Sequence, residues 1–189
     1  LPLLEINNED EAPDIIFVSC ASSKVSSFGK YKDSYEIYIL NEEYMCVLMN
    51  VESPYAKQQS ISLKTLATLP LAGFTYIDKQ GKMQHPFIES LLNKYGIKLN
   101  YVFLSDSFYN WDRYIEDGIA YVLVGSNYMS DYRKDRGNKN ISTITVPLKE
   151  KITTTHMMLI PKFKEKMPPQ EVFQKMVEQH YQSTFSPLK

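Results

Sequence analysis

The sequence predicts an α/β fold in which short apolar strands alternate with amphipathic helices around a largely parallel sheet. Apolar, β-branched and aromatic runs of strand length recur along the 189-residue chain. Segments with helical periodicity separate several of these runs. Hydrophobic residues make up 43% of the chain and aromatic residues 13%, which is enough for a buried core and too much for a disordered protein.

Composition excludes several classes of protein. The formal net charge of −1 gives no bulk attraction to nucleic acid. No apolar run is long enough for a membrane helix, and Leu1–Asp10 has no basic start or apolar stretch typical of a signal peptide. The cysteines, Cys20 and Cys46, both lie in apolar runs, where cysteine is most often a small buried hydrophobe. We therefore expect a cytoplasmic chain without disulfides.

The first elements are strands. We expect a buried strand at Asp14–Ser19, then a loop rich in serine, lysine and glycine at Cys20–Ser34. Two further strands are predicted at Tyr35–Leu40 and Tyr44–Met49. Ser53–Phe74 is polar at first and apolar at its end, which favours a connector between two compact units.

The middle of the chain alternates helices and strands. Ser62 is a candidate cap for a helix at Leu63–Thr68, before a strand at Leu71–Tyr76 and a turn at Asp78–Lys82. The remaining predicted elements are a helix Pro86–Tyr95 ended by Gly96, a strand Asn100–Leu104, a helix Phe108–Glu116 ended by Gly118, and a strand Ile119–Val124.

The last third begins with a polar stretch, Ser126–Lys139, expected to be a short helix and a loop. Strands are predicted at Ile141–Val146 and His156–Ile160. A last amphipathic helix starts at Pro168–Pro169; Val172, Phe173, Met176, Val177 and either His180 or Tyr181 share one side of it.

No catalytic or metal-binding motif is present. His85, His156 and His180 have no metal-ligand spacing, and each is expected to be structural or solvent-facing. The sequence has no nucleophile elbow, no Walker loop and no dinucleotide-binding fingerprint. The carboxylate pair Glu116–Asp117 is typical of a protein surface. We therefore expect no enzyme, no metal and no cofactor.

Small hydroxyl side chains recur at or just after the carboxyl ends of predicted strands: Ser19, Thr75, Ser105, Ser107 and Ser126. That edge is where α/β sheets bind ligands, and hydroxyls beside helix N-termini suit a small polar or anionic molecule. Helix capping remains an alternative for each of them. Gly118 and Gly125 indicate either a close approach of the backbone to a ligand or simply the end of a helix and of a strand.

An ordered set of motifs carries a family resemblance. They are "DIIFVS" at Asp14–Ser19, "YMCVLMN" leading into "SPYA", "ISLKTLATLPL" at Ile61–Leu71, "YIEDGIAYVL" at Tyr114–Leu123, and the closing segment Val146–Tyr181. In this order the chain resembles the effector-binding domain of LysR-type transcriptional regulators. Glu116 and Leu123 depart from the family pattern, which has glycine and proline there. The family's first strand and helix, and its helix-turn-helix domain, are missing before Asp14.

The resemblance implies a two-lobed, type 2 periplasmic-binding-protein-like α/β fold with mixed sheets. Lobe one would be discontinuous, residues 1–58 and 152–189, and lobe two would be residues 59–151, with a small metabolite bound between them. The implied partners are the metabolite, a homodimer or tetramer formed partly through the Pro86–Tyr95 helix, and DNA only through a helix-turn-helix domain absent from this chain. A solute-binding protein of a transport system with the same fold is the alternative.

By the same resemblance, the ligand-binding residues would follow the strands of both lobes. Lobe one would contribute Ser19 and Cys20, from the loop after the Asp14 strand. The expected contacts of lobe two are Thr75, Tyr76, Ser105, Asp106, Ser107, Gly125 and Ser126. Asp106 would repel an anion unless it caps its own helix.

Overall fold

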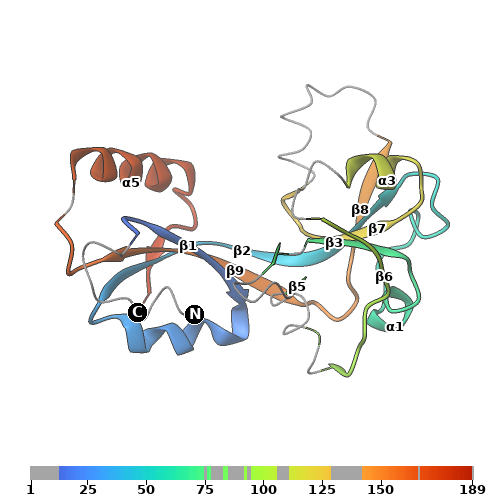
Figure 1. Ribbon diagram of the computed structural model, residues 1–189, viewed down its shortest axis with the longest axis horizontal. Coiled ribbons are helices and arrows are strands. Elements are labelled where there is room, and N and C mark those ends of the chain that lie inside the picture. The colour runs from blue at the N-terminus through green and yellow to red at the C-terminus, as the bar shows by residue number, and fades with distance from the viewer. Residues whose placement is uncertain are drawn as a thin grey trace. The chain divides into compact units, whose positions relative to one another are not determined.

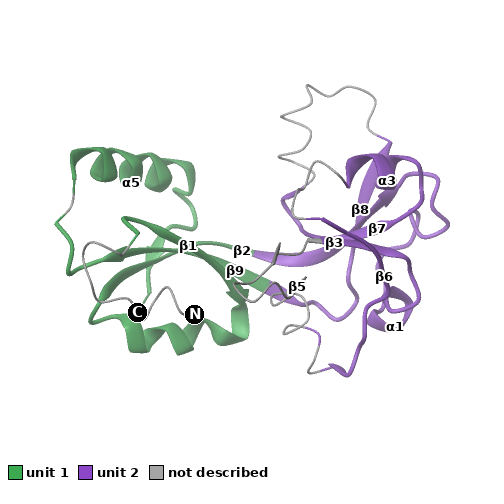
Figure 2. Ribbon diagram, in the orientation of Figure 1, with its two compact units in different colours: residues 1–42, 154–189 green, residues 43–153 purple. Residues whose placement is uncertain are grey.

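The computed structural model describes residues 13–74, 76–77, 83–84, 92, 95–105, 111–128, 142–165 and 167–188. The chain divides into two compact units, which Figure 2 shows in different colours. Unit 1 comprises Leu1–Glu42 and Thr154–Lys189, and unit 2 comprises Glu43–Thr153. Unit 1 is therefore discontinuous, and the chain passes between the units twice.

The first boundary lies well ahead of the expected one at residue 58, because β2 (Tyr35–Asn50) is one continuous strand that belongs to both units. The prediction of two separate strands here is wrong. Asn41–Glu43 contains neither glycine nor proline, so nothing in the sequence breaks the extended backbone. The expected connector around residues 53–62 lies inside unit 2, where Ile61 donates its N–H to the Pro147 carbonyl at 2.9 Å.

Unit 1 is built on antiparallel strands. β1 (Ile16–Ala21) pairs with β9 (Thr153–Pro161), which lies between β1 and β2, and β10 (Ser186–Pro187) pairs with the first half of β2. The predicted strand at Asp14–Ser19 therefore exists but extends to Ala21. A 3₁₀ helix, η2 (Ser22–Tyr31), occupies most of the segment predicted to be a loop. The largely parallel sheet expected from the sequence is not found among the described strands of this unit.

Helical segments cover both faces of this sheet (Figure 1). On one face Phe28 of η2 packs with Met157 and Leu159 of β9. On the other, Val177 of α5 (Pro168–His180) packs with Met158 and Ile160. Since side chains alternate along a strand, β9 is buried on both faces. Its unbroken apolar run MMLI is typical of such a strand.

Helix α5 begins at Pro168 as predicted, but its buried side is not the predicted apolar one. Val172, Phe173 and Met176 are exposed, and only Val177 of the predicted set is buried. Gln170 is buried instead, because its amide donates to the Asp14 carbonyl at 2.8 Å. A polar side chain can face the interior when its hydrogen bonds are satisfied there, so apolar periodicity alone identified the wrong side.

Unit 2 has a mixed sheet in the order β2-β7-β3-β6, with β8 also paired to β2. β3 is parallel to both β6 and β7, whereas β2 is antiparallel to β7 and β8. The strand bounds are β3 Leu71–Phe74, β6 Tyr101–Ser105, β7 Tyr121–Gly125 and β8 Thr143–Pro147; a separate hairpin pairs β4 (Tyr76–Ile77) with β5 (Met83–Gln84). The predicted strands of this unit are thus present, with shifted ends.

Two short helices complete unit 2. In α1 (Leu63–Leu66) the Ser62 hydroxyl accepts from the Thr65 N–H at 3.1 Å, which confirms Ser62 as its cap. α3 (Asp112–Glu116) packs Ile115, together with the preceding Trp111, on β2 and β7. Gly118 ends this helix with φ +70°, a conformation that favours glycine.

Several predictions fall outside the described residues. They are the turn Asp78–Lys82, most of the helix Pro86–Tyr95, the start of the helix Phe108–Glu116 and most of the polar stretch Ser126–Lys139. Gly96, expected to end the Pro86–Tyr95 helix, is described and has φ +64°. Among the helices that the structure describes, none is both long and apolar enough to cross a membrane.

Candidate functional site

The polar residues predicted at strand ends in unit 2 meet at one edge of its sheet. β3, β6 and β7 run parallel and end at Phe74, Ser105 and Gly125, and Phe74 pairs directly with Ser105. Because the carboxyl ends of parallel strands share an edge, Ser105, Gly125 and the following Ser126 lie along the same side of the unit. Tyr76 opens β4 just after β3. Of the other predicted ligand contacts, Thr75, Asp106 and Ser107 lie outside the described residues.

Individual residues at this edge differ in what they offer. Ser105 is only 7% exposed. Gly125 ends β7 next to the side chain of Glu43, whose carboxylate occupies the space that a Cβ at position 125 would need. A larger residue at position 125 would have to displace the Glu43 carboxylate, which is the end of a flexible side chain. A negative group at this edge favours a ligand that presents a hydroxyl or another donor there.

In unit 1, Ser19 and Cys20 lie within β1 and not in a loop after it, which corrects the prediction. The core of unit 1 extends to Cys20, which packs with Phe28, so the strand continues past the expected end. Its thiol is buried. Ser19 faces solvent, and its Oγ lies 2.7 Å from Nδ1 of His156.

Two site residues were missed by sequence reasoning, His156 and Ser22. His156 pairs directly with Ser19 across the β1–β9 ladder, and the Ser22 hydroxyl lies 2.8 Å from that of Thr155. Ser19 and His156 are separated by 137 positions in the chain. No local pattern connects them, because only the strand pairing brings them together.

The start of η2, beside Thr155 and on the sheet face opposite to Ser19 and His156, is a separate favourable position for negative charge. Its N-cap, Ala21, has no side chain that could satisfy the first amides, and its first turn contains no acidic residue. Lys24 lies in the same turn and is exposed. Helix N-terminal amides and a lysine attract anionic oxygens. The start of η2, with Ser22 and Lys24, therefore suits a carboxylate or a similar small anion, whereas Ser19 and His156 lie on the other face of the sheet, the one that α5 covers.

Neither cysteine is suited to nucleophilic chemistry. Burial, with a smaller contribution from Glu43, raises the pKa of Cys46 to about 11 from an ordinary value of 9.0. Burial also raises the pKa of Cys20, and Lys24 partly opposes that effect. In the described part of the chain, no group of three His, Cys, Asp or Glu side chains is placed to hold a metal ion.

We expect Cys46 in the folded chain to react with iodoacetamide at pH 8 at least about 100-fold more slowly than in urea, because a pKa two units higher leaves about 100-fold less thiolate. Mass spectrometry of chain labelled for different times measures both rates. A raised folded-state pKa also implies stability that is present below pH 9 and lost as the pH rises toward 11. Labelling of the folded chain as fast as in urea would contradict this assignment.

Comparison with known proteins places the fold. No family model matches the chain, and no curated protein matches it. HinK, a LysR family transcriptional regulator from Pseudomonas aeruginosa, is similar with a TM-score of 0.60 and 15% identity over 89% of this chain and 53% of that one. The regulatory domain of Synechocystis PCC6803 CcmR in complex with 2-PG is similar with a TM-score of 0.66 and 9% identity, over 92% of this chain and 76% of that one. The effector-binding domain of QuiR in complex with shikimate is similar with a TM-score of 0.61 and 14% identity, over 92% of this chain and 74% of that one.

The chain therefore has the fold of the effector-binding domains of LysR-type regulators, and the predicted fold class is confirmed. The resemblance found in the sequence motifs points to the same group of proteins as the solved structures. The chain spans about half the length of HinK, 53% of it.

Proposed function

We propose that the chain is the effector-sensing part of a LysR-type transcriptional regulator. It binds a small metabolite and controls, by a shift in conformational populations, DNA binding or transcription activation by an attached helix-turn-helix domain in the cytoplasm. The observation that carries the proposal is the fold shared with regulatory domains that were solved with shikimate and with 2-PG. We further propose that the two lobes correspond to units 1 and 2 and that the chain has no catalytic role.

The proposed effector is small and polar, with an anionic group. Ser19 and His156, which lie on one face of the unit 1 sheet, would bind that group. In unit 2 the contacts would come from Tyr76, Ser105, Gly125 and Ser126, and from the predicted residues Thr75, Asp106 and Ser107. The carboxylate of Glu43 beside Gly125 favours a ligand with a hydroxyl group at the unit 2 edge.

A thermal-shift screen tests the proposal, with shikimate, benzoate and other small hydroxylated or aromatic acids as probes. An effector at about 100 times its Kd stabilises the fold by about 2.7 kcal/mol, which raises Tm by roughly 5–10 °C in a chain of this size. Ser19→Ala should remove most of that shift and leave the Tm without ligand nearly unchanged, because Ser19 is exposed.

Ser26→Ala is the matched control, because Ser26 is an exposed serine of η2 outside the proposed contacts. A full ligand-induced shift in Tm in Ser19→Ala would show that Ser19 is not part of the effector site. A secretory signal encoded upstream of Leu1, instead of a helix-turn-helix domain, would support a solute-binding protein of a transport system. It would contradict the proposal that the chain is part of a transcriptional regulator.

We also propose a homodimer or tetramer, as the family resemblance implies. The predicted contact helix Pro86–Tyr95 lies largely outside the described residues, so the support is the resemblance alone. Sedimentation velocity over a wide concentration range should show a species heavier than the 21.9 kDa chain. A monomer at every concentration would contradict the proposal.

A further inference from the structure

Unit 2 contains a cavity of about 270 Å³ at the end of its sheet opposite Gly125. Two loops form it: one follows β2, and the other joins α3 to β7. The lining residues are Asn50, Glu52, Ser53, Pro54, Asp117, Gly118, Ala120 and Tyr121. Tyr121 begins β7 and Gly125 ends it, about 13 Å away for a strand of this length. None of the proposed effector contacts that the structure describes lines this cavity.

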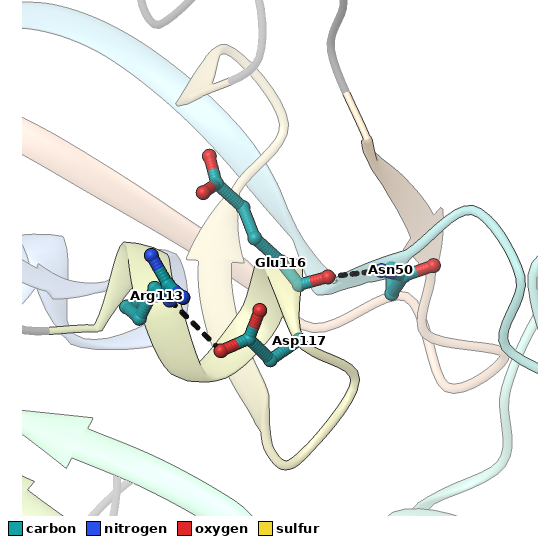
Figure 3. A network of polar contacts seen from close by, with 4 residues as sticks. All are labelled: Asn50, Arg113, Glu116 and Asp117. Atoms are coloured by element: carbon teal, nitrogen blue, oxygen red, sulfur yellow. Dashed lines mark hydrogen bonds and ion pairs between the residues drawn. The ribbon is translucent and has the colours of Figure 1, made fainter.

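Hydrogen bonds fix the walls of the cavity. The Asn50 Oδ1 accepts from the Glu52 N–H at 2.7 Å, and the Asn50 amide donates to the Glu116 carbonyl (Figure 3). One side chain therefore joins the two loops. The Ser53 and Tyr121 hydroxyls lie 3.1 Å apart on the opposite wall. The cavity walls are thus held in place by the chain's own hydrogen bonds, as in the largely pre-formed sites that bind small molecules.

The cavity presents acceptors and negative charge. Glu52 and Asp117 contribute carboxylates, and among the lining residues in the described part of the chain none is a lysine, arginine or histidine. Asn50 uses both ends of its amide within the protein. Asp117 already has a cationic partner, Arg113, whose Nε donates to Asp117 Oδ2 at 2.9 Å (Figure 3). Arg113 does not line the cavity, and its side chain is 83% exposed.

We propose that this cavity binds a small organic cation that carries a guanidinium or a primary ammonium group. The cationic group would donate to the Glu52 and Asp117 carboxylates, and the apolar part of the molecule would lie against Pro54 and the Tyr121 ring. A guanidinium matches carboxylates in a bidentate way and also stacks on aromatic rings. The volume lies near the lower limit for ligand pockets, about 300 Å³, so the ligand is small. The site is independent of the proposed effector site.

Agmatine, which has a guanidinium and an ammonium group, is the probe. It is titrated at low salt into the whole ¹⁵N-labelled chain, and two-dimensional NMR follows the amides. Saturable shifts are expected at Gly118, Ala120 and Tyr121. Glu52→Gln should weaken binding about tenfold, the effect of losing one charge-assisted hydrogen bond. 4-Guanidinobutyrate, which has a carboxylate in place of the ammonium, should bind more weakly than agmatine.

Arg113→Ala gives the sharpest test. It removes a competing cation from Asp117, so it should strengthen agmatine binding about threefold. Glu171→Gln, an exposed carboxylate on α5 in unit 1, is the control and should change nothing. Weaker binding in Arg113→Ala, or equal losses in Glu52→Gln and Glu171→Gln, would overturn the proposal. If the effector still raises the Tm of Glu52→Gln by the full amount, the cation site and the effector site are distinct.

Discussion

Replacing Leu159 by alanine is expected to destabilise unit 1 by about 2–5 kcal/mol, the usual cost of truncating a large core side chain. Leu159 lies in the middle of β9, and 0% of its surface is exposed. It packs with Met157 and Phe28 on the η2 face of the sheet. Because helical segments cover both faces of β9, the neighbours on either side cannot easily move to fill the resulting cavity. Urea denaturation followed by circular dichroism measures the loss in the first unfolding transition.

Met176→Ala is the matched control for this experiment. Met176 is an apolar residue of α5 in the same unit, but it is 59% exposed. Its replacement should change stability by no more than about 0.5 kcal/mol, as is usual for surface positions. A loss below about 1 kcal/mol in Leu159→Ala would show that β9 is not the centre of the core.

Gly73→Val is expected to destabilise unit 2 by about 1–3 kcal/mol through overpacking. Gly73 lies in β3, the strand between β7 and β6. A Cβ at this position would lie 2.8 Å from Cδ1 of the Tyr101 ring and 3.2 Å from a methyl carbon of Leu104. Both neighbours belong to β6 and are held by the ladder with β3, so the new side chain forces the Tyr101 ring out of its position.

A double-mutant cycle with Tyr101→Ala identifies the cause. If the ring is the obstacle, Gly73→Val should cost much less in the Tyr101→Ala background than in the wild-type chain. Denaturant midpoints of the four proteins give the coupling free energy. Equal costs of Gly73→Val in the two backgrounds would mean that backbone effects, and not contact with the ring, dominate.

Local periodicity was sufficient to predict most strands. The apolar runs that became β1, β6, β7 and β9 were recognised because a strand buried on one or both faces must carry apolar side chains at most or alternate positions. Ser62, Gly118 and Pro168 were also read correctly, since caps and helix ends depend on a few adjacent residues. Two strands were predicted where the structure has the single strand β2, which shows the limit of this reasoning. Local sequence does not distinguish a polar segment within a strand from a polar loop between two strands.

The candidate site could be predicted only in part. Its unit 2 edge was predicted because each serine or glycine follows its own strand, and parallel pairing brings those ends together. Cys20 was predicted to lie in a loop but lies within β1, since the length of β1 depends on what packs against it. The apolar side of α5 was misjudged because satisfied hydrogen bonds, which the sequence does not display, allow Gln170 to be buried.

The sequence by itself determined the fold class, the positions of most strands and the order of motifs shared with LysR-type effector-binding domains, because these follow from residue types within short windows. Only the tertiary structure decided that Ser19 meets His156, that Glu43 lies over Gly125 and that Asn50 joins two loops around a cavity. Each of these contacts joins residues that are distant in the chain. Strand pairing and loop packing create them, and no local pattern of residues records which distant partners will meet.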